Sequence, residues 1–175
     1  QSRGIWAVKV APSDANILYA ATTEGTYKST DAGETWSQIH DVIMNTTIAV
    51  NALDPNILVA GYGNFGSTGH GIYNSNDGGT TWTQNTDSNI PTDFNGKIEF
   101  AFSDNPAFAN ILYASIGNGF GFSDGASWLL RSDDFGASFT LESEEDYSLW
   151  QGWFAHDVAM SSGNPNFIMV IGIEI

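Results

Sequence analysis

Short apolar runs separated by turn-forming residues recur along the whole chain. The β-branched and aromatic run 5–10 ends at a turn cluster, and apolar residues resume at 17–21. Segments 25–29 and 35–39 continue the same pattern. Runs of this length, bounded by Gly, Pro, Asn and Asp, are typical of β-strands joined by tight turns. The pattern predicts an all-β chain whose first unit contains four strands.

The four-strand pattern then repeats. Comparable units are predicted at 46–84 and 97–141, with turns at 54–56 and around 104–106. A further unit begins at Phe154 and reaches the apolar run 167–173, close to the end of the sequence. A period of about 40–50 residues is typical of a four-stranded propeller blade. The blades are therefore predicted at 5–39, 46–84, 97–141 and 154–175, the last of them incomplete.

One motif, Ser-x-Asp-x-Gly-x-(Ser/Thr)-aromatic, sets this period. It occupies 29–36, 75–82 and 132–139. An Asp two positions before a Gly suits a tight hairpin turn, because the carboxylate accepts backbone N–H groups and the Gly supplies a positive φ. The closing aromatic ring is expected to be buried under the turn, where a Trp hides ~150–250 Å². We expect a structural role for Asp31, Gly33, Trp36, Asp77, Gly79, Trp82, Asp134, Gly136 and Phe139.

These motifs resemble the Asp-box, or BNR repeat, of sialidases, sortilin-type receptors and two-propeller xyloglucanases. In those families the box is a structural turn between the third and fourth strands of a blade. The overall repeat style, with 151–154 at a blade start, also resembles bacterial cell-surface propellers of Bacteroidetes that carry a type IX secretion sorting domain. The resemblance implies that 1–175 is part of one β-propeller domain, with three full blades and half of a fourth.

Closed propellers need about 4–8 blades. A fragment of a larger propeller is therefore expected, completed by the remaining blades of the same chain or by a partner chain. The chain has no Cys, and no apolar run approaches the ~20 residues of a membrane helix. The resemblance implies an extracellular or cell-surface bacterial protein, and the lack of such an apolar run predicts that it does not insert into a membrane.

The negative charge of the chain restricts the classes of ligand that it is expected to bind. Twenty acidic residues against five basic ones give a formal net charge of −15. Nucleic acids and anionic membranes are recognised through Lys and Arg, so neither is an expected partner. No cofactor is expected, and the oxygen-rich surface leaves only calcium as an alternative.

Candidate ligand contacts fall on one predicted face. Antiparallel strands reverse at each turn, so the motif turns and the Pro-containing turns share one face, and the longer connections 63–70, 117–126 and 142–153 share the other. Aromatic rings and acids gather in these connections and suit a glycan or a protein ligand, since loops on a rigid scaffold commonly carry function. The candidates are Phe65, Phe120, Phe122, Asp124, Trp150 and Trp153, although Trp153 also suits a buried position at the start of an inner strand.

Catalysis is the alternative. Glycoside hydrolysis needs two carboxylates flanking the scissile bond, and xyloglucanase propellers carry a catalytic Asp in a Thr-Asp-x-Gly-Gly loop. The matching segment here reads Thr-Thr-Glu-Gly at 22–25, so that Asp is absent and Glu24, displaced by one position, is the candidate. Two functions stay open: a non-catalytic binding module, or a xyloglucanase-type glycosidase whose catalytic residues lie mostly outside these residues. His40, His70 and His156 are too scattered for a zinc site.

Overall fold

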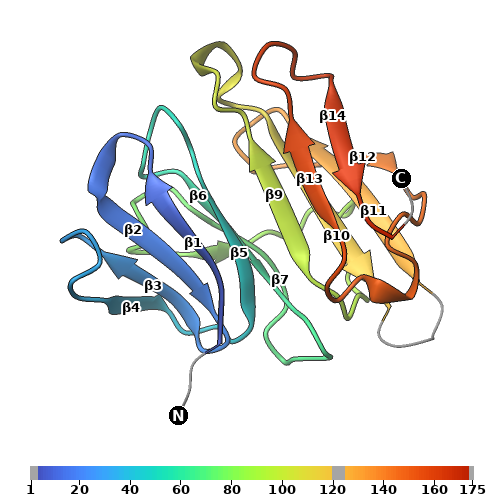
Figure 1. The fold of residues 1–175 in the computed structure, drawn as a ribbon, viewed down its shortest axis with the longest axis horizontal. Helices are drawn as coiled ribbons and strands as arrows, with labels where there is room; N and C mark the ends of the chain where they lie inside the picture. Colours follow the sequence, from blue (N-terminus) through green and yellow to red (C-terminus); the bar gives the residue numbers. More distant parts are fainter. Residues whose placement is uncertain (1–3, 120–124, 174–175) are drawn as a thin grey trace.

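The computed structural model describes residues 4–119 and 125–173, and these form four antiparallel sheets (Figure 1). Blade 1 consists of β1 (Ile5–Ala11), β2 (Asp14–Thr22), β3 (Gly25–Ser29) and β4 (Ser37–His40). Blade 2 consists of β5 (Asn45–Val50), β6 (Leu58–Tyr62), β7 (Gly71–Ser75) and β8 (Thr83–Gln84). Blade 3 consists of β9 (Ile98–Phe102), β10 (Leu112–Asn118), β11 (Ala126–Ser132) and β12 (Thr140–Ser143). Blade 4 contains β13 (Asp157–Met160) and β14 (Ile168–Ile171).

Within each blade, every strand pairs with the next strand in the sequence. This up-and-down order confirms the predicted all-β propeller segment of three four-stranded blades and a two-stranded fourth. Two 3-10 helices, η1 (Pro106–Phe108) and η2 (Leu149–Gln151), interrupt the connections. No helix of the described part of the chain has the length and apolar character required to cross a bilayer.

The first strands of the blades are neighbours. β1 contacts β5, β5 contacts β9, and β9 contacts β13, so these four strands form the inner side of the arrangement. Figure 1 shows β9 and β13 side by side with the same direction. Residues that begin an inner strand therefore lie at the same end of the molecule.

The two ends of the blades differ, as strand parity predicts. The connections after β9 and after β13 lie at the upper edge of Figure 1, whereas the N-terminus and the connection between β6 and β7 lie at the lower edge. Each motif turn is hydrogen-bonded to its own blade at or just before the start of the second strand: Ala32 N–H donates to Asn16 O at 3.0 Å, Gly78 N–H to Asn56 O at 3.0 Å and Phe135 N–H to Asn110 O at 2.9 Å. We call this upper end the repeat-turn face and the opposite end the variable face.

The core fills the three seams between neighbouring blades. The seam between blades 1 and 2 contains Tyr19, Ile48, Leu58 and Tyr62. A larger cluster joins blades 2 and 3, and a smaller one joins blades 3 and 4. The large buried side chains of each blade thus depend on a neighbouring blade for cover.

This dependence corrects the expectation that every motif aromatic is buried. Phe139 is only 2% exposed, Trp82 is partly buried against blade 1, and Trp36 is 38% exposed. The aromatic residues of the second and third motifs pack against the preceding blade: Trp82 stacks on the His40 ring of blade 1 at a centroid distance of 5.1 Å, and Phe139 belongs to the cluster that joins blades 2 and 3. In the described residues no sheet lies on that side of blade 1, so Trp36 contributes instead to an apolar depression with Ile5.

Candidate ligand-binding site

The three motif turns share one hydrogen-bond network. In the first, Ser29 Oγ donates to Asp31 Oδ1 at 2.7 Å and accepts from Gly33 N–H at 2.9 Å. Thr35 donates its N–H to Asp31 Oδ1 at 2.9 Å and its hydroxyl to Oδ2 at 2.5 Å. The turns at 75–82 and 132–139 repeat these four bonds. Each Gly has the positive φ that the turn requires: 93° at Gly33, 89° at Gly79 and 85° at Gly136.

These hydrogen bonds stabilise the ionised carboxylates. The hydroxyl and N–H donated by Thr35 and Thr81 lower the pKa values of Asp31 and Asp77 to about 2. Burial acts against the shift at Asp134, but hydrogen bonds from Ser138 and Ser132 lower the pKa of that carboxyl as well. Both oxygens of each carboxylate are bonded within the turn, which is an arrangement that fixes the backbone.

Four aromatic rings meet at the variable face and come from three different blades. Trp6 lies in β1, Phe65 lies in the connection between β6 and β7, and Trp153 and Phe154 precede β13. The ring centroids are 6.3 Å apart for Trp6 and Phe65, 5.2 Å for Phe65 and Trp153, and 5.3 Å for Trp153 and Phe154. We call these four residues the ring row.

The ring row presents apolar surface to solvent. Phe154 is 60% exposed and Phe65 is 45% exposed, whereas Trp6 and Trp153 are partly buried. Phe65 has a φ of 52°, in the left-handed region that a large side chain rarely adopts. The Nε1 of Trp6 is buried and has no hydrogen-bond partner among residues 4–119 and 125–173. A strained, exposed aromatic residue beside an unpaired donor is unusual for a site whose only role is packing.

Charged groups lie on the inner strands beside the ring row. Lys97 directly precedes β9. Its Nζ forms an ion pair with Glu99 Oε1 at 2.6 Å, and both side chains are largely buried. Burial raises the pKa of Glu99, and the Lys97 ammonium opposes that shift. Asp157 at the start of β13 and Lys9 in β1 also act on the Glu99 carboxyl. Lys97 N–H donates to Gly152 O at 3.0 Å, so the main chain before β9 is bonded to the residue that directly precedes Trp153.

His156, three residues after Trp153, is a buried neutral side chain. Its Nδ1 is 2.8 Å from Ser115 Oγ, which is 2.7 Å from the Tyr147 hydroxyl. Its Nε2 is 3.1 Å from Lys97 O. Burial lowers the pKa of His156 to about 3. Both ring nitrogens therefore have partners within the seam between blades 3 and 4, as expected for a histidine satisfied by its neighbours.

The structure brings two of the predicted ligand residues together, Phe65 and Trp153. Trp153 is partly buried in the turn before β13 and does not lie within that strand. Trp150 lies in η2, with its backbone against Gly119. Phe120, Phe122 and Asp124 lie outside the described residues.

Glu24, the catalytic candidate, lies in the turn between β2 and β3. Its N–H donates to Thr22 Oγ1 at 3.1 Å, and its Oε2 accepts from the Tyr27 hydroxyl at 3.5 Å.

The sequence analysis did not identify Trp6 and Phe154 as candidate ligand contacts. Both lie near the start of an inner strand, and this position on the variable face is the signal that could have identified them.

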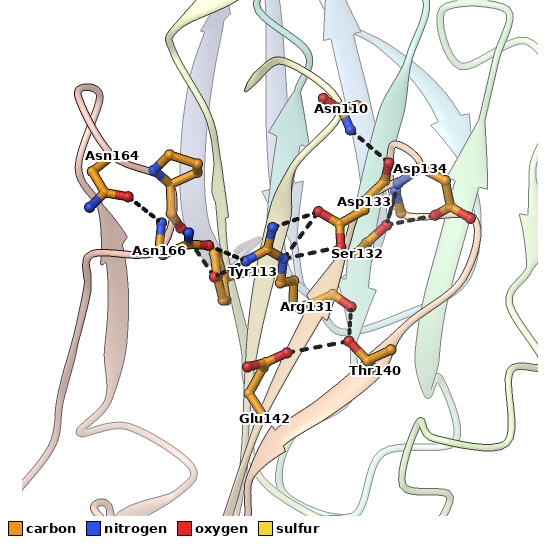
Figure 2. Close-up of polar contacts among 12 residues, drawn as sticks. Asn110, Tyr113, Arg131, Ser132, Asp133, Asp134, Thr140, Glu142, Asn164 and Asn166 are labelled. Atoms are coloured by element: carbon orange, nitrogen blue, oxygen red, sulfur yellow. Dashed lines mark hydrogen bonds and ion pairs between the residues drawn. The ribbon is translucent and has the colours of Figure 1, made fainter. Parts of the chain in front are cut away.

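Arg131 joins blades 3 and 4 on the repeat-turn side (Figure 2). Its guanidinium donates to both oxygens of Asp133, with a shortest distance of 2.7 Å, and to Asn166 Oδ1 at 2.6 Å. The same nitrogen that reaches Asn166 also donates to the Tyr113 hydroxyl at 3.1 Å, and that hydroxyl donates to Pro165 O. These partners occupy the donors of the planar guanidinium and hold the side chain between the two blades.

In the described part of the chain, no cluster of three or more His, Asp or Glu residues is arranged to hold a metal ion.

Comparison with known proteins identifies solved structures that share this fold. No protein-family model and no curated protein sequence matches this chain. Among solved structures, an ancestral GH74 enzyme matches with a TM-score of 0.69 and 23% identity, over 95% of this chain and 21% of that protein. A GH74 enzyme from Niastella koreensis matches with a TM-score of 0.49, 15% identity and coverage of 94% and 34%. A GH74 xyloglucanase from Xanthomonas campestris matches with a TM-score of 0.46, 14% identity and coverage of 94% and 35%. The chain spans about a fifth of the length of the ancestral enzyme, and the similarity to it concerns the propeller fold.

Proposed function

We propose that this chain is part of an exported, bacterial Asp-box propeller that binds a glycan on its variable face through the ring row. The ring row is the observation that carries the proposal. Exposed aromatic rings bind the apolar C–H faces of sugars, and neighbouring carboxylates accept hydrogen bonds from sugar hydroxyls. Phe65, Trp153 and Phe154 supply the rings, and the inner strands β9 and β13 supply the acids Glu99 and Asp157.

The charge of the chain restricts the ligand. A formal net charge of −15 repels polyanions, so a neutral glycan is the proposed ligand class. Binding requires no catalytic pair, and the Glu99 carboxyl, which pairs with the Lys97 ammonium at 2.6 Å, offers oxygen acceptors to sugar hydroxyls. The proposed site is therefore a binding surface without a resident cofactor.

A glycan-array measurement tests this function. Phe65→Ala combined with Trp153→Ala should abolish binding of neutral glycans by the 175-residue chain. Phe135→Ala is the matched control, because Phe135 is also an exposed phenyl group, at 39%, with a φ of 64°, but lies in a motif turn on the opposite face. Loss of binding in both variants, or in neither, would exclude the ring row as the site.

Glycoside hydrolysis is the second candidate function. The fold similarity to an ancestral GH74 enzyme supports it, and burial raises the pKa of Glu99, which is a property of general acids in glycosidases. Release of reducing ends from xyloglucan by the wild type, abolished in Glu99→Gln, would support catalysis within these residues. Binding without hydrolysis would support the binding module.

A further inference from the structure

A single buried side chain, Asn64, links the backbones of the two central residues of the ring row, Phe65 and Trp153. Its Oδ1 accepts the N–H of Phe65 at 3.0 Å, and its Nδ2 donates to Trp153 O at 2.8 Å. The backbone of Asn64 is held in turn by Ser67, whose N–H donates to Asn64 O at 2.9 Å. The bond from Asn64 to Trp153 joins segments of blade 2 and blade 4, since these two residues are 89 positions apart in the sequence.

Both hydrogen bonds of Asn64 fix a feature that the local sequence does not favour. A left-handed backbone is disfavoured for a phenylalanine, so the bond to Phe65 N–H helps to hold that conformation. The bond to Trp153 O crosses from the β6–β7 connection to the segment before β13 without passing through blade 3. A buried amide that lost either partner would be left unsatisfied, which makes the two contacts interdependent.

We propose that Asn64 is the positioning residue of the ligand site, setting the distance between the Phe65 and Trp153 rings so that they contact successive units of one glycan chain. This inference rests on the proposed function. The two ring centroids are 5.2 Å apart with an interplanar angle of 47°, and only a ligand that touches both rings depends on this spacing. Oligosaccharides should therefore respond to changes at Asn64, while a monosaccharide that contacts a single ring should not.

The chain contains a close chemical match to Asn64 on the repeat-turn face. Asn51 is equally buried, its Nδ2 donates to Ala109 O at 2.6 Å in blade 3, and its Oδ1 accepts the N–H groups of Leu53 and Asp54. Asn51→Ala removes the same kind of hydrogen bonds between blades, but no ring of the ring row depends on them. It separates general destabilisation from a change in ring spacing.

The test compares Asn64→Ala, Asn64→Asp and Asn51→Ala with the wild type. Binding of cellotetraose and of glucose is measured, together with NMR contacts between the Phe65 and Trp153 rings. Asn64→Ala should weaken cellotetraose binding roughly tenfold or more, leave glucose binding unchanged and remove the ring contacts. Asn64→Asp keeps the acceptor for Phe65 N–H but lacks the donor to Trp153, so it should lie between Asn64→Ala and the wild type. Asn51→Ala should keep both the ring contacts and the affinity.

The NMR contacts between the Phe65 and Trp153 rings test the positioning role of Asn64 even if cellotetraose is not a ligand. Ring contacts that persist in Asn64→Ala, or that disappear equally in Asn51→Ala, would overturn the positioning role. If the wild type binds no glycan but Asn64→Ala alone loses the ring contacts, the proposed function fails while the control of ring spacing by Asn64 stands.

Discussion

The two faces of the blades are built in different ways. On the repeat-turn face, three segments with the same motif form the same hydrogen bonds, each contained within eight residues. On the variable face, the connections differ in length and sequence, and the rings of three blades meet in one cluster. Repetition on one face reflects a requirement of the fold, whereas the gathering of dissimilar segments on the other is the feature on which the proposed binding site rests.

Acid titration should separate the buried histidines between the blades from the carboxylates of the repeat-turn face, and it should produce the largest effect. The folded-state pKa of His156 is lowered to about 3, so its neutral form contributes stability that is fully present above about pH 6.5 and is lost as the pH falls towards 3. The expected loss is up to about 5 kcal/mol. Burial also lowers the pKa of His40, which adds to the loss in the same direction.

The motif carboxylates should respond only at lower pH. The pKa values of Asp31 and Asp77 are lowered to about 2 from 3.8, so their contribution is lost between those values. Urea unfolding measured at intervals from pH 7 to pH 2 distinguishes the two windows. A free energy of unfolding that stays constant between pH 6.5 and pH 4 would contradict the buried neutral His156.

Substitution of the motif aromatics should expose the dependence on a preceding blade. Phe139→Ala should lower the free energy of unfolding by about 3–5 kcal/mol, because the ring is buried against blade 2. Trp36→Ala should cost about 1 kcal/mol or less, because no described sheet covers that ring. Trp82→Ala should lie between them. Equal losses in all three variants, measured by urea unfolding, would show that the turn alone determines the contribution of the aromatic residue.

Substitution of the serines that begin the motifs should lower the free energy of unfolding by a similar amount in all three turns, unlike substitution of the aromatic residues. Each hydroxyl is buried and accepts the N–H of the motif Gly, at 2.9 Å in the first two turns and 2.8 Å in the third. Ser29→Ala, Ser75→Ala and Ser132→Ala should each cost about 1–3 kcal/mol by leaving that N–H unsatisfied. Differential scanning calorimetry should give similar losses for the three variants, and a much smaller loss at Ser29 would show that the network also needs a neighbouring blade.

The smallest effect on stability is expected at the strained phenylalanines. Phe65→Gly and Phe135→Gly each relieve a positive φ, so the free energy of unfolding should change by less than about 1 kcal/mol, in the stabilising direction. Only Phe65→Gly should weaken glycan binding, because Phe135 lies on the repeat-turn face. A large destabilisation of Phe65→Gly would instead assign the ring a packing role.

The all-β class, the blade period and the chemistry of the motif turns were all predictable from the sequence, because each depends on residues close together in the chain. The full motif forms the same turn in all three places where it occurs, as the matching networks of Asp31, Asp77 and Asp134 show. Strand parity likewise follows from counting turns, and it placed the motif turns and the long connections at opposite ends.

The tertiary structure alone decided which of these residues are buried and which meet. Trp36, Trp82 and Phe139 close the same motif, but their exposure depends on a sheet that the motif does not encode. Trp6, Phe65 and Trp153 lie in three separate blades, and their contact depends on the angle and spacing between those blades. Packing between sheets sets that geometry, and the spacing of residues along the chain carries no record of it.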